Sequence, residues 1–211
     1  MTQCVDFIVV GSGMAGASIA YELSERGASV TVLEAEEYAG YHTTGRSAAF
    51  YMVGYGNDVV RGITLSSEGF YNNPPAGFCD YPLLKPLGAM YIAKPEQLPQ
   101  LSDTHHNVSQ VLDNVALVDE AFVYDKVPEL KPGIDAGFWE PNSREIDVAS
   151  LLEGYIKFAK RSGATFIYNA GVTGLRREDE RWRVETVKGE FIGKKIVNAA
   201  GAWGDKLCAM A

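Results

Sequence analysis

The 211-residue sequence predicts an α/β fold, in which helices cover a buried parallel sheet. Three observations support this prediction. Residues 5–10 form an apolar, β-branched run, as expected of a strand buried on both faces. Residues 14–26 follow with the apolar spacing of a helix, and Gly27 is placed to end it. Residues 29–33 then have the composition of a second strand, which completes a strand–helix–strand unit.

A glycine motif, G-x-G-x-x-G, connects the first strand to the helix. Gly11 permits the tight turn, Gly13 lets the backbone approach a pyrophosphate, and Gly16 lets the helix pack closely on the strand. The first helical residues, Met14 and Ala15, present N–H groups and the positive end of the helix dipole to an anion. The motif therefore predicts a phosphate site at the start of this helix.

Glu34 ends the second predicted strand and is followed by Ala35. A carboxylate at this place can accept hydrogen bonds from both ribose hydroxyls of an adenosine, and it repels a 2′-phosphate. Glycines used only for chain turning would leave Glu34 unexplained. Strand, glycine motif, helix and acidic residue together predict a dinucleotide-binding site.

The segment 40–56, "GYHTTGRSAAFYMVGYG", favours FAD over NAD(P) as the dinucleotide. An NAD domain would usually continue into another helix and strand, whereas this segment is dense in small and hydroxyl side chains. Such a segment can run along an extended cofactor, with hydroxyls donating to phosphate oxygens and an arginine offsetting phosphate charge. A solvated loop is the alternative. The candidate cofactor residues here are His42, Thr43, Thr44, Gly45, Arg46, Ser47 and Ala48.

Composition excludes several classes of partner. The formal net charge of −8 argues against nucleic acid and against an anionic membrane surface. No apolar run is long enough to span a bilayer, and the N-terminus lacks the basic region of a signal peptide. Three scattered cysteines fit a reducing compartment, so we expect a cytoplasmic protein.

The rest of the chain gives a coarser pattern. Adjacent His105 and His106 have no third ligand nearby, so we expect a solvated loop rather than a metal site. Small residues 198–201 form a turn after a strand, and a helix follows over 203–211. The other expected helices are 58–71, 96–100, 108–114, 119–127 and a clear one from Asp147 to Gly163, and the other expected strands are 89–93, 164–169, 172–177, 182–187, 190–192 and 196–198.

Several ordered motifs resemble the FAD-dependent amino-acid oxidase superfamily: the glycine motif, Glu34, "GYHTTGRSAAFY" and "VNAAGAW". Within it, "NPPAGFC" and "YPLL" are most similar to bacterial D-arginine dehydrogenases. The resemblance implies a Rossmann-like FAD-binding domain of the glutathione-reductase type with part of a mixed α+β substrate domain. It implies an FAD domain built from residues 1–80 and 144–211 and a substrate segment at 81–143. It also implies that a C-terminal continuation or a second chain completes the fold.

The resemblance also assigns roles to individual residues. It implies that His42 is a structural residue beside the flavin rather than a catalytic base. Val172 would meet the adenine. The turn after the last strand would bring four further residues near the cofactor, Ala199, Ala200, Gly201 and Trp203.

The activity that the resemblance implies is oxidation of the CH–NH bond of an amino acid, with hydride transfer to flavin N5. The resulting imine hydrolyses to a 2-oxo acid and ammonia. Tyr55 is the candidate catalytic residue, because it matches a tyrosine that lines the substrate pocket in the resembling family, although a core aromatic is an equal alternative. The resemblance implies that the partner is a small-molecule substrate, an amino acid or an amine, and it leaves the electron acceptor unidentified. An electron acceptor embedded in the inner membrane would place the protein at the periphery of that membrane.

Two departures from the D-arginine dehydrogenases concern the substrate pocket. Phe50 stands where they carry a histidine, and Ala89 stands where they carry a glutamate. Ala89 cannot pair with a guanidinium, and an unpaired buried cation is costly. Phe50, Met52 and Ala89 therefore predict an apolar D-amino acid or an N-substituted amine. The rival interpretations are an NAD(P)-dependent dehydrogenase and a non-catalytic dinucleotide-binding subunit. We expect this chain alone to be inactive.

Overall fold

The computed structural model describes residues 4–211, which form two compact units. The first unit comprises the chain up to Ser47, residues 75–81 and residues 148–211. The second comprises residues 48–74 and 82–147. Residues 48–74, which the sequence-based division grouped with the first segment, thus belong to the second unit.

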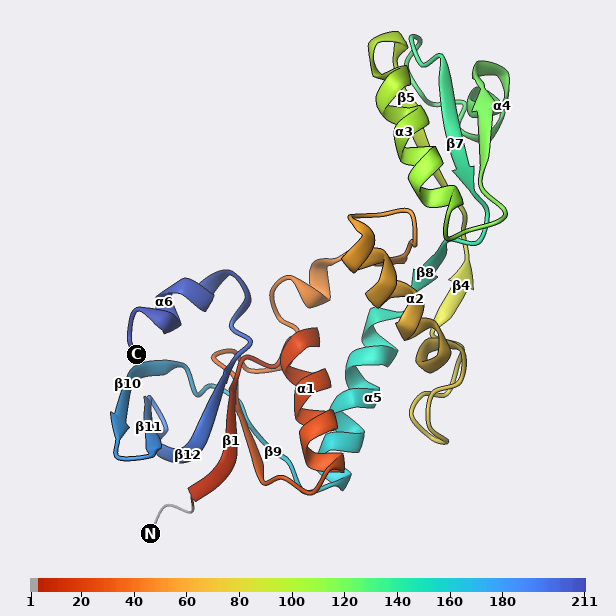
Figure 1. Ribbon diagram of the computed structural model, residues 1–211. Helices are drawn as coiled ribbons and strands as arrows, with labels where there is room; N and C mark the ends of the chain where they lie inside the picture. The colour runs from red at the N-terminus through yellow and green to blue at the C-terminus, as the bar shows by residue number, and fades with distance from the viewer. Residues whose placement is uncertain (1–3) are drawn as a thin grey trace. The chain divides into compact units, whose positions relative to one another are not determined.

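The first unit is built on a six-stranded sheet with the strand order β10-β11-β12-β1-β2-β9 (Figure 1). The strands β12, β1, β2 and β9 are parallel, whereas β10 and β11 form an antiparallel extension. Their bounds are β1 Cys4–Val10, β2 Val30–Leu33, β9 Thr165–Ile167, β10 Val172–Glu178, β11 Arg181–Thr186 and β12 Gly189–Asn198.

The sheet is buried on both faces, as the apolar run predicts. Ile8 and Val10 pack with Leu33, Val184 and Leu207 on one face. Val9, which alternates with them along β1, is fully buried on the opposite face. The helix α1, Met14–Glu25, and the helix α5, Val148–Arg161, pack against each other (Figure 1).

The predicted strands 190–192 and 196–198 are a single strand, β12. Its first half, up to Gly193, pairs with β11, and β1 pairs with it from Ile192 to Asn198, so β1 holds it extended through the polar residues Lys194 and Lys195. At Gly193 a Cβ atom would stand 2.8 Å from Cγ1 of Ile8, so β12 lies very close to the core there. The polar interruption in the sequence concealed this continuity.

The second unit contains two three-stranded sheets, β3-β8-β4 and β5-β7-β6. The predicted helix over 108–114 is wrong, because α3 ends at Ser109. His105 and His106 lie on α3 rather than in a loop, and residues 4–211 contain no group of side chains suited to a metal ion. The bounds are β3 Phe50–Tyr51, α2 Asp58–Asn72, β4 Leu84–Pro86, β5 Ala89–Ala93, α3 Leu98–Ser109, β6 Ala116–Asp119, α4 Glu120–Lys126, β7 Ala136–Glu140 and β8 Arg144–Ile146.

None of the helices in the described part of the chain is both long and apolar enough to cross a bilayer.

A polar cluster ties β1 to its neighbours and predicts a pH dependence of stability. Asp6 accepts hydrogen bonds from Lys194 Nζ at 2.7 Å and from the Ser29 amide and hydroxyl at 2.9 and 2.6 Å. These hydrogen bonds hold the pKa of Asp6 well below its usual range, and the bond from Lys194 has the largest effect. The ionised Asp6 carboxylate therefore stabilises the folded state fully above about pH 4, where Asp6 of the unfolded chain is also ionised. This stabilisation is lost as the pH falls toward the lowered pKa of Asp6 in the folded chain. Asp6→Asn should lower the free energy of unfolding more at pH 6 than at pH 2.5, and equal effects would contradict this.

Candidate functional site

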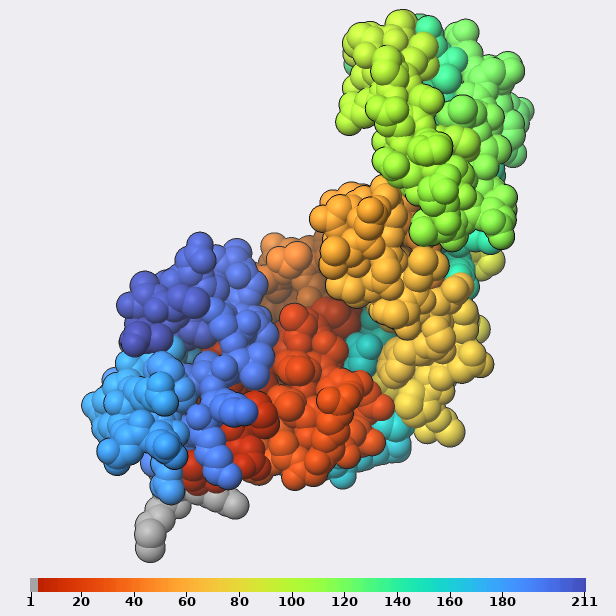
Figure 2. Space-filling view, viewed as in Figure 1, coloured from red at the N-terminus to blue at the C-terminus, as the bar shows by residue number. Residues whose placement is uncertain are grey.

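A cavity of about 570 Å³ opens at the carboxyl ends of β1, β2 and β12. This is the place where α/β sheets bind ligands. All of its lining residues belong to the first unit, and the last residues of the chain, dark blue in Figure 2, form one of its borders. It is lined by Val10, Gly11, Gly13, Met14, Ala15, Leu33, Glu34, Ala35, Glu36, Gly40, Tyr41, His42, Thr43, Thr44, Ala170, Gly171, Val172, Ala199, Ala200, Gly201, Ala202, Trp203, Lys206, Leu207 and Met210.

Close packing explains two glycines of the motif. Gly11 has φ +100°, and a Cβ atom there would stand 2.4 Å from the Ala199 carbonyl oxygen. At Gly16 a Cβ atom would stand 1.9 Å from the Gly11 carbonyl oxygen, a separation that no side chain can adopt. The two glycines therefore bring β1, α1 and the turn after β12 together around the start of the helix.

The N-terminus of α1 offers donors to an anion. Gly13, the N-cap residue, has no side chain to cap the helix. The Met14 amide donates to Oγ1 of Thr44 at 3.0 Å. The amides of Gly13, Ala15 and Gly16 have no hydrogen-bond partner among residues 4–211. Since Gly13 and Ala15 line the cavity, these free donors fit a diphosphate.

Glu34 stands at the end of β2, where the sequence placed it, and its carboxylate is held from three directions. Its Oε2 accepts from the amide and the hydroxyl of Ser12, both at 2.7 Å. Its Oε1 accepts from the Glu36 amide at 3.0 Å. Glu34 is only 9% exposed yet lines the cavity, so its carboxylate is available to a ligand in a fixed orientation. This arrangement fits the sugar of an adenosine.

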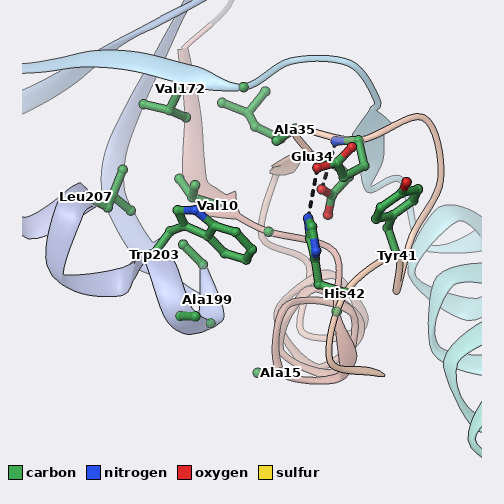
Figure 3. Close-up of a pocket in the computed structure, with 18 of the residues that line it drawn as sticks. Val10, Ala15, Glu34, Ala35, Tyr41, His42, Val172, Ala199, Trp203 and Leu207 are labelled. Atoms are coloured by element: carbon green, nitrogen blue, oxygen red, sulfur yellow. Dashed lines mark hydrogen bonds and ion pairs between the residues drawn. The ribbon is translucent and has the colours of Figure 1, made fainter. Parts of the chain in front are cut away.

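His42 and Trp203 form an aromatic part of the cavity wall (Figure 3). Their ring centroids are 4.5 Å apart, and Tyr41 contacts the other side of the histidine at 5.0 Å. The His42 Nε2 pairs with Oε1 of Glu36 at 2.8 Å. One ring nitrogen of His42 is thereby committed to a carboxylate, as suits a structural role.

The structure separates the predicted cofactor residues into two groups. Most of them line the cavity, including Val172 and the 199–203 turn. Gly16, Gly45, Arg46, Ser47 and Ala48 do not.

Arg46 departs from its predicted role of offsetting phosphate charge at the site. Its Nε donates to the Tyr41 carbonyl at 3.2 Å, and its guanidinium lies over the Tyr41 ring. The Lys or Arg side chain that lines the cavity, among the described residues, is Lys206 on α6, Gly204–Cys208. Leu207 on α6 and Met210 in the turn that follows it also line the cavity, and no pattern in the sequence singled out Lys206.

The predicted substrate residues all lie in the second unit and outside the cavity lining. Tyr55 is 68% exposed in a turn, and Phe50 is exposed on β3. Met52 is half-buried, and so is Ala89, which lies on β5 directly opposite Glu140 of β7. Whether these residues bind substrate stays a prediction.

Comparisons with known proteins agree with this geometry. The family model described as DAO, FAD dependent oxidoreductase, matches residues 6–211. N-methyl-L-tryptophan oxidases of Escherichia coli and Shigella boydii are 27% identical over 207 residues, which cover 94% of this chain and 54% of theirs. The chain thus spans about half the length of the curated relatives it matches.

Solved structures share the fold. Glycine oxidase from Geobacillus kaustophilus superimposes with a TM-score of 0.86 at 20% identity, covering 99% of this chain and 58% of that one. L-α-glycerophosphate oxidase from Mycoplasma pneumoniae with FAD bound gives 0.84 at 22% identity, covering 99% and 57%. The family model matches nearly the whole chain, and the cavity combines amide donors that fit a diphosphate with a carboxylate acceptor that fits a ribose. The chain belongs to the DAO family of FAD-dependent oxidoreductases.

Proposed function

We propose that this chain supplies the FAD site, and part of the substrate region, of an enzyme that oxidises the CH–NH bond of an amino acid or amine. One observation carries the proposal most directly: the cavity joins free amides at the start of α1 to the oriented carboxylate of Glu34. The α1 amides bind the diphosphate, and Glu34 binds the adenosine sugar. Bound FAD supplies the hydride acceptor for the oxidation.

The proposed substrate has an apolar side chain. Ala89 offers no charge, and the carboxylate directly opposite, that of Glu140, is occupied by the backbone amides of Val53 and Gly54 at 2.9 and 3.1 Å. Glu140 is 1% exposed, so it gives no counter-ion to a basic substrate. An unpaired guanidinium would be strongly disfavoured beside these residues. A D-amino acid such as D-leucine or D-phenylalanine fits this description.

The relatives named above favour a second candidate within the same reaction class, an N-substituted aromatic amino acid. Because the chain spans about half of those relatives, we propose that turnover needs a further segment or a second chain. This chain alone should bind FAD without oxidising substrate.

The test is flavin reduction by amino acids in the absence of oxygen. The complete FAD-loaded enzyme is mixed with D-leucine, D-phenylalanine, D-arginine or N-methyl-L-tryptophan, and bleaching of the visible flavin band is followed. We expect D-leucine or D-phenylalanine to reduce the flavin about tenfold faster than D-arginine, or more, which corresponds to roughly 1.4 kcal/mol or more. Faster reduction by D-arginine would contradict the apolar pocket. A purified protein that retains no flavin and binds none on addition would contradict the proposed function itself.

A further inference from the structure

The carboxylate of Glu140 holds the turn that carries Tyr55. Its Oε1 accepts a hydrogen bond from the Val53 amide at 2.9 Å, and its Oε2 accepts one from the Gly54 amide at 3.1 Å. Glu140 ends β7 and is 1% exposed, so this carboxylate lies inside the second unit. The two residues before Tyr55 are thus bound to a strand that lies 87 and 86 residues later in the sequence.

This carboxylate serves the turn alone. A carboxylate buried to such a degree is costly unless hydrogen bonds satisfy it. Within residues 4–211, both donors to the Glu140 side chain are amides of the turn. The buried charge and the turn therefore depend on each other.

The turn lies directly on the side chains beneath it. A Cβ atom at Gly54 would stand 2.5 Å from Oε2 of Glu140 and 2.9 Å from the hydroxyl oxygen of Tyr91. Tyr91 lies on β5, and its hydroxyl is buried without a hydrogen-bond partner in the described part of the chain. Glu140 and Tyr91 therefore determine how closely the turn packs on β5 and β7.

Tyr55 extends from the bound part of the turn toward solvent. It is 68% exposed and makes no hydrogen bond within residues 4–211, which does not fit a core aromatic of this chain. The next residue, Gly56, has φ +85° and leads the backbone into α2. The place of the Tyr55 ring is therefore set by its backbone, which Glu140 holds on one side and Gly56 turns on the other.

We propose that Glu140 is a positioning residue for the substrate, because its bonds to the Val53 and Gly54 amides set the place of Tyr55 in the substrate pocket. The inference rests on the proposed function, since it takes Tyr55 to contact the amino acid that is oxidised. Glu140 is buried and both of its oxygens are engaged, so it acts through the backbone of the turn. Its effect on the substrate should vanish when the Tyr55 side chain is removed.

The experiment is a double-mutant cycle on flavin reduction by the complete FAD-loaded enzyme without oxygen. The substrate is whichever of D-leucine, D-phenylalanine, D-arginine and N-methyl-L-tryptophan reduces the flavin fastest. The measured quantity is the limiting rate constant of reduction divided by the apparent dissociation constant of the substrate. Glu140→Gln leaves one amide of the turn without an acceptor, so this ratio should fall about fivefold to tenfold. In a Tyr55→Ala background, where the ratio is already at least about tenfold lower, the same substitution should change it less than about twofold.

The outcomes separate this inference from the proposed function. A loss of equal size in both backgrounds would mean that Glu140 supports the enzyme without acting through Tyr55, and would overturn the inference. An unchanged ratio in Tyr55→Ala alone would also overturn it, because Tyr55 would then make no contact with the substrate. Both results leave the proposed oxidation in place. Failure of all four amino acids to reduce the flavin would overturn the proposed function, and this inference with it.

Two further variants approach the same contact without changing Glu140. Gly54→Ala places a Cβ atom against Glu140 and Tyr91, so the turn must move and the ratio should fall about fivefold, again only when Tyr55 is present. Tyr91→Phe is the matched control, because it removes a hydroxyl that has no partner beneath the same glycine and leaves both acceptors of the turn. Its ratio should stay within about twofold of the unmodified enzyme. An unchanged ratio in Gly54→Ala, or a loss in Tyr91→Phe as large as that in Glu140→Gln, would contradict the role assigned to Glu140.

Discussion

Gly16→Ala is expected to abolish nucleotide binding and to lower the free energy of unfolding by about 3 kcal/mol. The new Cβ atom would lie 1.9 Å from the Gly11 carbonyl oxygen and 2.9 Å from its carbonyl carbon. Gly11 cannot retreat, because its amide is bonded to the Leu33 carbonyl at 2.8 Å and its φ is +100°. Helix α1 must therefore move away from β1, and its free amides leave the cavity. Denaturant unfolding and an ADP titration measure the two effects.

Gly62→Ala provides the matched control for this prediction. Gly62 lies inside α2, and a Cβ atom there would have no heavy atom within 4 Å. Alanine favours helix over glycine by up to about 1 kcal/mol, so this variant should be equal to or more stable than the original chain. A Gly16→Ala chain that binds ADP with unchanged affinity would refute the close-packing explanation of the motif.

Glu140→Leu is expected to destabilise the second unit by about 3 kcal/mol or more, because the amides of Val53 and Gly54 would lose their acceptors inside the protein. The backbone at Gly54 lies directly on the carboxylate, since a Cβ atom there would stand 2.5 Å from Oε2 of Glu140. Denaturant unfolding, together with hydrogen exchange of the peptide that contains residues 50–56, would detect the loss.

Two further variants make the prediction specific. Glu140→Gln keeps one acceptor and should have an intermediate effect, whereas Glu145→Gln, at an exposed position on β8, should have almost none. Burial, and then the charge of Glu140, raise the pKa of Tyr91. The pKa of Tyr91 should therefore fall in Glu140→Gln, because the charge is gone while the burial stays. Wild-type stability in Glu140→Leu would contradict the assigned role of this carboxylate.

Local patterns in the sequence were sufficient to predict the first forty residues. The strand, the glycine motif, α1 and Glu34 at the end of β2 occur within a short stretch of chain, and each contributes a periodicity or a backbone requirement that short-range sterics impose. The family resemblance extended this prediction to the turn after β12, whose residues do line the cavity.

Other features depend on pairings that no local pattern encodes. The continuity of β12 comes from partners on both of its sides, and Glu140 reaches amides that lie 87 and 86 residues earlier. Periodicity reports which residues are buried, but it does not report which distant segment buries them.

The sequence by itself therefore determined the nucleotide-binding unit and the position of its acidic residue. Only the tertiary structure decided that Lys206 rather than Arg46 lines the cavity, and that Ser12 already occupies half of the Glu34 carboxylate. The physical reason is that a side chain's type limits the bonds it can make, whereas the packing of distant elements decides which bonds remain open to a ligand.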